Sequence, residues 1–243
     1  LKKDMLDKVP DFHRRLKWFQ QYREKNQQYL VIEELNDHDD ILLSLVPKSR
    51  LEKLMKALLD ENEFLSPGGI RSISKIHEHG YSVDIDGQEF GLDYQPAEGT
   101  SALFGGNSNW RGPVWMPMNY LLVQALQTLY EYHNDELQVE LPTGSGNKAN
   151  LGEVSNDLAK RLVSIFEKDT NGMRPANMDH PVYQHNEHFK DLVLFYEYFH
   201  GDNSRGVGAS HQTGWTGVVA ELINKLNKTE VKKMNKKKHE MVM

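Results

Sequence analysis

Apolar side chains recur every three or four residues over most of this chain, which is the spacing of one face of a helix. Pro117 suits the first turn of one such helix, and Ser49 with Glu52 fits a capping box at the start of another. The stripes predict helices over 12–19, 51–58, 122–129, 158–166, 189–196 and 219–226.

A different pattern occupies residues 81–94, where apolar and polar residues alternate on both sides of Asp86-Gly87. That dipeptide is the strongest signal for a two-residue β-hairpin. Long Gly-, Asn- and Pro-rich connections separate the predicted helices, and such loops on a helical frame more often line a site than merely link elements. We therefore expect an all-α fold with long loops and one small hairpin.

Composition narrows the function classes. The net charge of −6 argues against general nucleic-acid binding, and the absence of cysteine excludes disulfides and zinc–thiolate sites. No apolar run reaches the roughly 20 residues that span a bilayer, so we expect no membrane association. The lack of cysteine suits a reducing compartment, and we expect a cytoplasmic location. We predict no cofactor and no metal site. The lysine-rich end, residues 229–243, reads as a flexible basic tail.

One carboxylate has an unusual setting. Glu197 lies in the aromatic run FYEYF, and a helix there would place it beside Val193 and Leu194 on an apolar face. A carboxylate in such a partly desolvated position can act as a general base toward water. A Glu that is ion-paired at a helix end is the plainer interpretation, and the residues alone favour it.

A second motif, FGGNSNWRGPVW at residues 104–115, places Trp110 and Trp115 around Arg111. The apolar faces of sugar rings stack on Trp, and their hydroxyl pairs suit the guanidinium fork. The alternative is that both tryptophans anchor the core and that Arg111 belongs to a structural ion pair.

A third cluster, His211, Gln212 and Trp215, follows a glycine-rich stretch. We expect its polar side chains to cap a helix or to donate hydrogen bonds to a substrate.

Together these motifs resemble glycoside hydrolase family 63, the family of processing α-glucosidases and mannosylglycerate hydrolases. The resemblance runs collinearly from about residue 5 to 225, through the segments EFLSPGGIRSISKIH, VDIDGQEFGLDYQPAEG, FGGNSNWRGPVWMPMNYLL, ELPTGSG and FYEYFHGDNSRGVGASHQTGWTG. It implies an (α/α)6 barrel and an inverting mechanism with Glu197 as general base. It also implies a sugar-binding cleft that includes Trp110, Arg111, Trp115, His211, Gln212 and Trp215.

The resemblance also implies a general acid, an Asp in a run of the type D-G-F-Y-Y-D, and nothing in this sequence matches that run. We therefore expect residues 1–228 to be the C-terminal portion of a catalytic module. Its partners would be the N-terminal remainder of that module and an oligosaccharide or small glycoside substrate. A carbohydrate-binding or structural fragment without turnover is the alternative, and a polysaccharide lyase of similar architecture is a weaker one.

Overall fold

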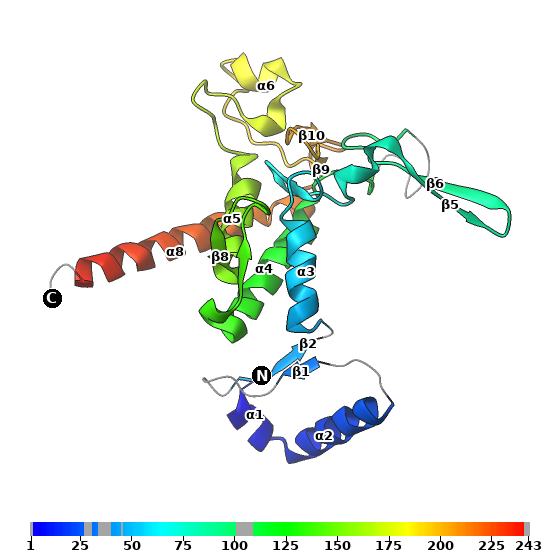
Figure 1. Ribbon diagram of the computed structural model, residues 1–243. Coiled ribbons are helices and arrows are strands. Elements are labelled where there is room, and N and C mark those ends of the chain that lie inside the picture. The colour runs from blue at the N-terminus through cyan, green and yellow to red at the C-terminus, as the bar shows by residue number, and fades with distance from the viewer. Residues whose placement is uncertain (1, 27–30, 34–39, 45, 101–108, 241–243) are drawn as a thin grey trace.

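The computed structural model describes residues 2–26, 31–33, 40–44, 46–100 and 109–240. Within these residues the protein is rich in helix and carries several small two-stranded sheets (Figure 1). The α-helices are α1 Lys3–Asp7, α2 Pro10–Lys25, α3 Lys48–Leu58, α4 Met116–His133, α5 Leu151–Ser164, α6 Pro181–His185, α7 Thr213–Thr216 and α8 Val219–Glu240. Short 3₁₀ turns occur at η1 Lys75–His79, η2 Asn134–Glu136 and η3 Pro175–Asn177.

Each sheet is an antiparallel pair of neighbouring strands. The pairs are β1 Val31–Glu33 with β2 Leu42–Ser44, β3 Leu65–Ser66 with β4 Gly69–Ile70, β5 Tyr81–Ile85 with β6 Gln88–Leu92, β7 Gln138–Glu140 with β8 Lys148–Asn150, and β9 Tyr198–Phe199 with β10 Gly206–Val207. The β5–β6 hairpin projects from the body of the molecule (Figure 1).

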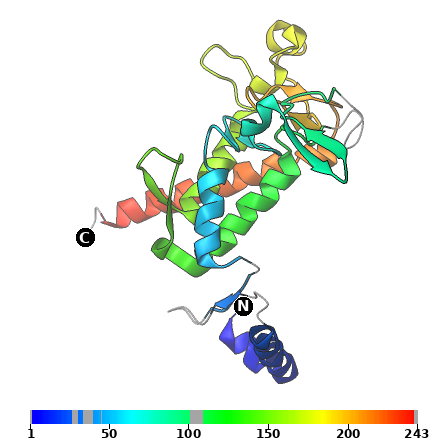
Figure 2. The same cartoon turned by 45° about the vertical axis from the view of Figure 1, so that its right-hand side comes forward.

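The core lies where α5 packs between α4 and α8, with α3 alongside (Figures 1 and 2). Leu126, Leu158 and Leu222 come from the three packed helices and are almost completely buried. Burial of each such side chain contributes about 1.5–3 kcal/mol. The start of α5 is fixed by a reciprocal capping box between Asn150 and Glu153. This frame carries the loops that hold the candidate site.

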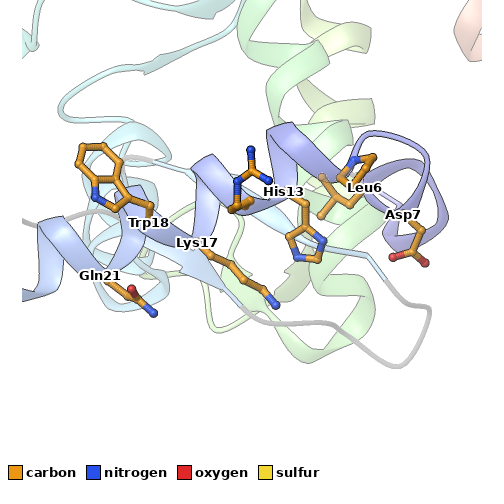
Figure 3. A pocket seen from close by; sticks show the side chains of 8 residues that line it. Leu6, Asp7, His13, Lys17, Trp18 and Gln21 are labelled. Atoms are coloured by element: carbon orange, nitrogen blue, oxygen red, sulfur yellow. The ribbon is translucent and has the colours of Figure 1, made fainter.

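The N-terminal helices lie apart from that core (Figures 1 and 2). No residue of α2 is buried, and Trp18 on this helix is largely exposed. A pocket of about 530 Å³ is lined by side chains of α1 and α2. Figure 3 shows these side chains, among them Leu6, His13 and Lys17. The lining residues all come from α1 and α2, so this pocket is separate from Glu197.

Most of the predicted elements are confirmed. The stripes at 12–19, 51–58, 122–129 and 219–226 lie inside helices, and the stripe at 158–166 ends two residues beyond α5. Pro117 occupies the first turn of α4. Asp86 and Gly87 have φ values of 54° and 79°, the left-handed pair that a tight two-residue hairpin turn requires.

Two local predictions are wrong. The capping box at Ser49 does not form, because α3 already begins at Lys48 with Pro47 as its N-cap and no capping side chain. The helix predicted over 189–196 is also absent. Its backbone pairs with a distant segment instead: the Phe195 N–H donates to Ser210 O at 3.1 Å, and the Gln212 N–H donates to Phe195 O at 2.8 Å. At Phe195 this pairing takes the place of the helical i→i−4 bonds.

At the other end of the chain, α8 continues as helix through residue 240, including much of the predicted tail at 229–243. The division of the chain at residue 228 stays a prediction. None of the described helices has the length and apolar character needed to cross a membrane.

Candidate functional site

Two segments that are far apart in the sequence, around Val114 and around Phe199, meet at the β9–β10 hairpin. The Phe199 N–H donates to Val114 O at 2.9 Å, and the Val114 N–H donates to Phe199 O at 2.8 Å. The Phe195 pairing with the 210–212 segment extends the contact on the other side. The two motifs that the sequence singled out, around Trp110 and around Glu197, are therefore brought together.

Glu197 lies at a bend immediately before β9, not on the helix that the sequence predicted. Its side chain is half-buried. The backbone N–H of Ala209, just after β10, donates to Glu197 Oε2 at 3.4 Å. The carboxylate is thus oriented by the hairpin itself.

All three tryptophans of the predicted site belong to one aromatic cluster. Trp115 lies at its centre, 2% exposed, and its Nε1 donates to Asn109 O at 3.0 Å. Trp110 stacks on it in parallel, with ring centroids 3.9 Å apart and planes 1° apart. Trp215 meets it edge-on at 6.1 Å. Trp110 and Trp215 are each 37% exposed, so they present aromatic surface to solvent.

Tyr198 connects this cluster to Glu197. Its buried ring stacks on Trp115 with centroids 4.7 Å apart. A Cβ built on Gly208 would lie 2.9 Å from Tyr198 Cε1 and 2.8 Å from Glu197 Oε2. Because both atoms lie close to this one point, the carboxylate sits beside the aromatic cluster. A half-buried carboxylate next to exposed indole rings combines a group that can accept a proton with surfaces on which a sugar ring can stack.

Arg111 is placed differently. Its side chain is buried, Nη1 donates to Asp93 Oδ1 at 3.2 Å, and Nη2 donates to Gln95 Oε1 at 2.7 Å. These contacts join the Trp110 loop to the segment that follows β6. A direct contact between Arg111 and a substrate stays a prediction.

His211 and Gln212 have exposed side chains next to the same hairpin. Gln212 is the N-cap residue of α7, but its side chain makes no capping hydrogen bond. The capping role that the sequence allowed is therefore wrong for Gln212. A hydrogen bond from either side chain to a substrate stays a prediction.

The sequence reasoning missed a buried arginine network under the hairpin. Arg71 Nη2 donates to Asp202 Oδ1 at 3.1 Å, and Lys75 and Tyr94 donate to the same oxygen. Arg71 Nε also donates to Gly201 O at 3.1 Å. Burial alone would raise the pKa of Asp202, but the hydrogen bonds from Lys75 and Tyr94 and the charge of Arg71 hold it below its ordinary value. The network ties the β9–β10 turn to the segment after β4.

A second cluster, around Arg205, lies closer to the surface. Arg205 donates to both carboxylate oxygens of Glu98, at 3.3 and 3.0 Å, and its Nε lies 2.9 Å from Asp179 Oδ2. The hydrogen bonds from Arg205 hold the pKa of Glu98 below its ordinary value. Asn109 was also missed: it is buried, and its Nδ2 donates to Gln95 O and Ala97 O at 2.6 and 2.7 Å. The only signal for Arg205 and Asn109 was their place in the segments that carry the family resemblance, and Asp179 lies outside those segments.

The start of the FGGNSNWRGPVW motif, residues 104–108, including the paired glycines at 105 and 106 that would allow close backbone approach, lies outside the described residues. Over the part of the chain that the structure covers, no group of three or more His, Asp or Glu side chains is arranged to hold a metal ion.

Comparison with known proteins gives these contacts a family context. The chain is 42% identical over 229 residues to the Saccharomyces cerevisiae protein named uncharacterized protein YMR196W, a match over 92% of this chain and 21% of that protein. It is 25% identical over 185 residues to the mannosyl-oligosaccharide glucosidase of the same yeast, over 75% of this chain and 16% of the relative. It is 28% identical over 186 residues to a probable mannosyl-oligosaccharide glucosidase of Schizosaccharomyces pombe, over 76% and 17% respectively.

This chain thus spans only about a fifth or less of the length of these relatives. The likeness to the glucosidases agrees with the resemblance to glycoside hydrolase family 63 that the sequence motifs carry. The sequence model of the mannosylglycerate hydrolase MGH1-like glycoside hydrolase domain matches residues 11–216, which include both tryptophan motifs and Glu197. The chain therefore belongs to the MGH1-like glycoside hydrolase family.

Proposed function

We propose that this chain supplies the water-activating half of an inverting α-glycosidase active site, with Glu197 as general base. One observation carries the proposal: a half-buried carboxylate, oriented by the Ala209 amide, lies beside a cluster that exposes two indole rings. Removal of a proton from water needs a carboxylate held near the attacked carbon, and a sugar ring is held by stacking on Trp.

In this reaction Glu197 takes a proton from a water molecule as its oxygen attacks the anomeric carbon. A carboxylic acid on the opposite side of the sugar protonates the leaving oxygen. The two carboxyl groups of an inverting enzyme lie roughly 6.5–9.5 Å apart, which leaves room for the water. Trp110 and Trp215 would form the wall against which the sugar stacks.

We further propose that the acid comes from an Asp upstream of this chain, and that the helices described above are the C-terminal portion of an (α/α)6 barrel. The proposal is supported by the absence of a matching acid motif in the sequence and by the far greater length of the relatives. Substrates would be α-linked glucosides or mannosides, because the matched domain is named for a mannosylglycerate hydrolase and two relatives for a glucosidase.

The first test compares hydrolysis of α-glucosides and α-mannosides by the 243-residue chain and by a version extended upstream. Loss of one member of an acid–base pair removes roughly 10²–10⁴-fold of rate, so the short chain should be slower by that factor. Full activity of the short chain would contradict the upstream acid.

The second test replaces Glu197 by Gln in the extended enzyme. Gln keeps the shape of the side chain but cannot accept the proton, so kcat should fall by roughly 10²–10⁴-fold while sugar affinity stays nearly unchanged. Glu98→Gln is the matched control, because both Glu98 oxygens are already engaged by Arg205. NMR of the first product should show inversion at the anomeric carbon, and retention would refute the mechanism.

The same measurements test the alternative function, in which the protein binds carbohydrate but does not hydrolyse it. The half-exposed Trp110 ring, stacked flat on a buried indole, favours that second candidate because it forms a rigid platform. Sugar binding by the extended protein, with no hydrolysis before or after the Glu197→Gln substitution, would support it.

A further inference from the structure

Gly208 occupies the turn just after β10 and faces the carboxylate of Glu197. A Cβ at this position would lie 2.8 Å from Glu197 Oε2 and 3.0 Å from Glu197 Cβ. The first distance is shorter than real Cβ contacts and the second is tight, and the same Cβ would lie 2.9 Å from Cε1 of the buried Tyr198 ring, so a side chain at 208 would force Glu197 and Tyr198 to move. The backbone of the turn therefore forms one wall of the space that the carboxylate fills.

The backbone conformation at position 208 is only one of two reasons why glycine is required there. Gly208 has a φ of +73°, in the left-handed region that favours glycine. Gly172 has nearly the same φ, +78°, yet a Cβ there would meet nothing within 4 Å. The two positions share the backbone requirement, and only Gly208 adds the steric one.

The turn is also held firmly in place. On one side Val207 pairs with Tyr198 in the β9–β10 hairpin. On the other side Ser210 O accepts the Phe195 N–H at 3.1 Å. Between these two fixed points the Ala209 N–H donates to Glu197 Oε2. A turn anchored at both ends has little room to retreat, so the side chain of Glu197, together with the neighbouring Tyr198 ring, would have to yield.

We propose that Gly208 and Ala209 are positioning residues that hold the Glu197 carboxylate at the attacking water. Gly208 leaves the space, and the Ala209 amide fixes the direction of Oε2. This inference rests on the proposed role of Glu197 as general base. It predicts that a substitution at Gly208 or Ala209 lowers the rate of the chemical step. Substrate binding should stay intact, because the exposed Trp110 and Trp215 rings are not among the residues that hold Glu197.

The test is Gly208→Ala in the complete natural enzyme that carries this segment, beside Gly172→Ala as the matched control. Both substitutions place an alanine at a left-handed φ, so both should lower the melting temperature, and Gly208→Ala should lower it further because its Cβ also crowds Glu197 and the buried Tyr198 ring. Only Gly208→Ala should change catalysis: a displacement of about 1 Å at a reacting group can cost about 10²-fold, so kcat should fall by about that factor. KM and the dissociation constant of an unreactive substrate analogue should stay within about twofold, as expected when only the transition state is affected.

A double-substitution cycle checks that the effect passes through Glu197. In a Glu197→Gln background, Gly208→Ala should cause no further loss of kcat, because groups that act as one unit are not additive. An equal loss in both backgrounds would overturn the inference in favour of a general structural role.

If Gly208→Ala does not fold, Ala209→Pro decides, because it removes the amide donor and adds no side chain at 208. A fall in kcat of about tenfold with unchanged KM would support the positioning role of the Ala209 amide. A kcat within twofold of the Gly172→Ala control, in whichever variant folds, would overturn it. Full activity of Glu197→Gln alone would instead refute the general base, so the two failures are distinguishable.

Discussion

Trp110 and Trp115 stand five positions apart in one motif and lie flat against each other, yet their surroundings are opposite. Trp115 is buried by Tyr198, Trp110 and Trp215 and hydrogen-bonded through its indole nitrogen. Trp110 covers one face of Trp115 and is itself 37% exposed. The inner ring is part of the frame, and the outer ring is the one that we propose to meet a ligand.

The other predicted site residues also divide into an inner layer of buried side chains and an outer layer of exposed ones. Arg111 is buried with Asp93 and Gln95 and belongs to the inner layer. His211 and Gln212 are exposed and belong to the outer layer. Residue type does not separate the layers, because Trp and Arg can serve as packing or as recognition groups. The inner residues differ from the outer ones in being buried and in having side chains that are hydrogen-bonded within the protein.

The largest effect should come from Trp115→Ala. It removes the central ring of the cluster and leaves the Asn109 carbonyl without its donor. Truncation of a buried Trp typically costs about 3–5 kcal/mol, so the free energy of unfolding should fall by about that amount in urea denaturation of the chain. Trp110→Ala is the control and should cost less than about 1.5 kcal/mol, the worth of one aromatic pair. Equal losses in the two variants would erase the distinction between inner and outer ring.

A smaller loss of stability is expected from Arg111→Lys. Lysine keeps the charge but cannot reach Asp93 and Gln95 at once with a planar fork. Loss of one buried hydrogen bond should lower the free energy of unfolding by about 1–2 kcal/mol, measured in the same urea experiment. Sugar affinity of the extended enzyme should change by less than about threefold. Weaker sugar binding at unchanged stability would show instead that Arg111 contacts the substrate.

The frame could be predicted because its signals are local. Leu158 and Leu162 repeat at helical spacing and are both fully buried on α5. The Asp86-Gly87 turn also carries its own conformational requirement, independent of the rest of the chain. Where a pattern and the tertiary contacts agree, the sequence is a sufficient guide.

The stretch 189–196 shows where local reasoning fails. Its apolar residues have helical spacing, but Leu192 and Val193 are 46% and 42% exposed and form no buried face. The backbone at Phe195 is engaged by residues 210–212 instead. The Arg71–Asp202 pair was missed for a related reason, because its members lie 131 positions apart and neither has a local pattern. Contacts between distant residues cannot be predicted from the pattern within a window of ten residues.

The effect that is smallest in free energy is also the most direct test of the outer layer. Trp110→Ala in the extended enzyme should weaken binding of an unreactive substrate analogue by about 3–10-fold, because one stacking face is worth about 0.5–1.5 kcal/mol. Trp110→Phe should recover part of this affinity, since a smaller ring still offers a flat face over Trp115. Affinity can be followed by isothermal titration calorimetry. Since Trp115 and Glu197 remain in place, kcat at saturating substrate should fall less than KM rises. A loss confined to kcat would mean that Trp110 supports the carboxylate and not the sugar.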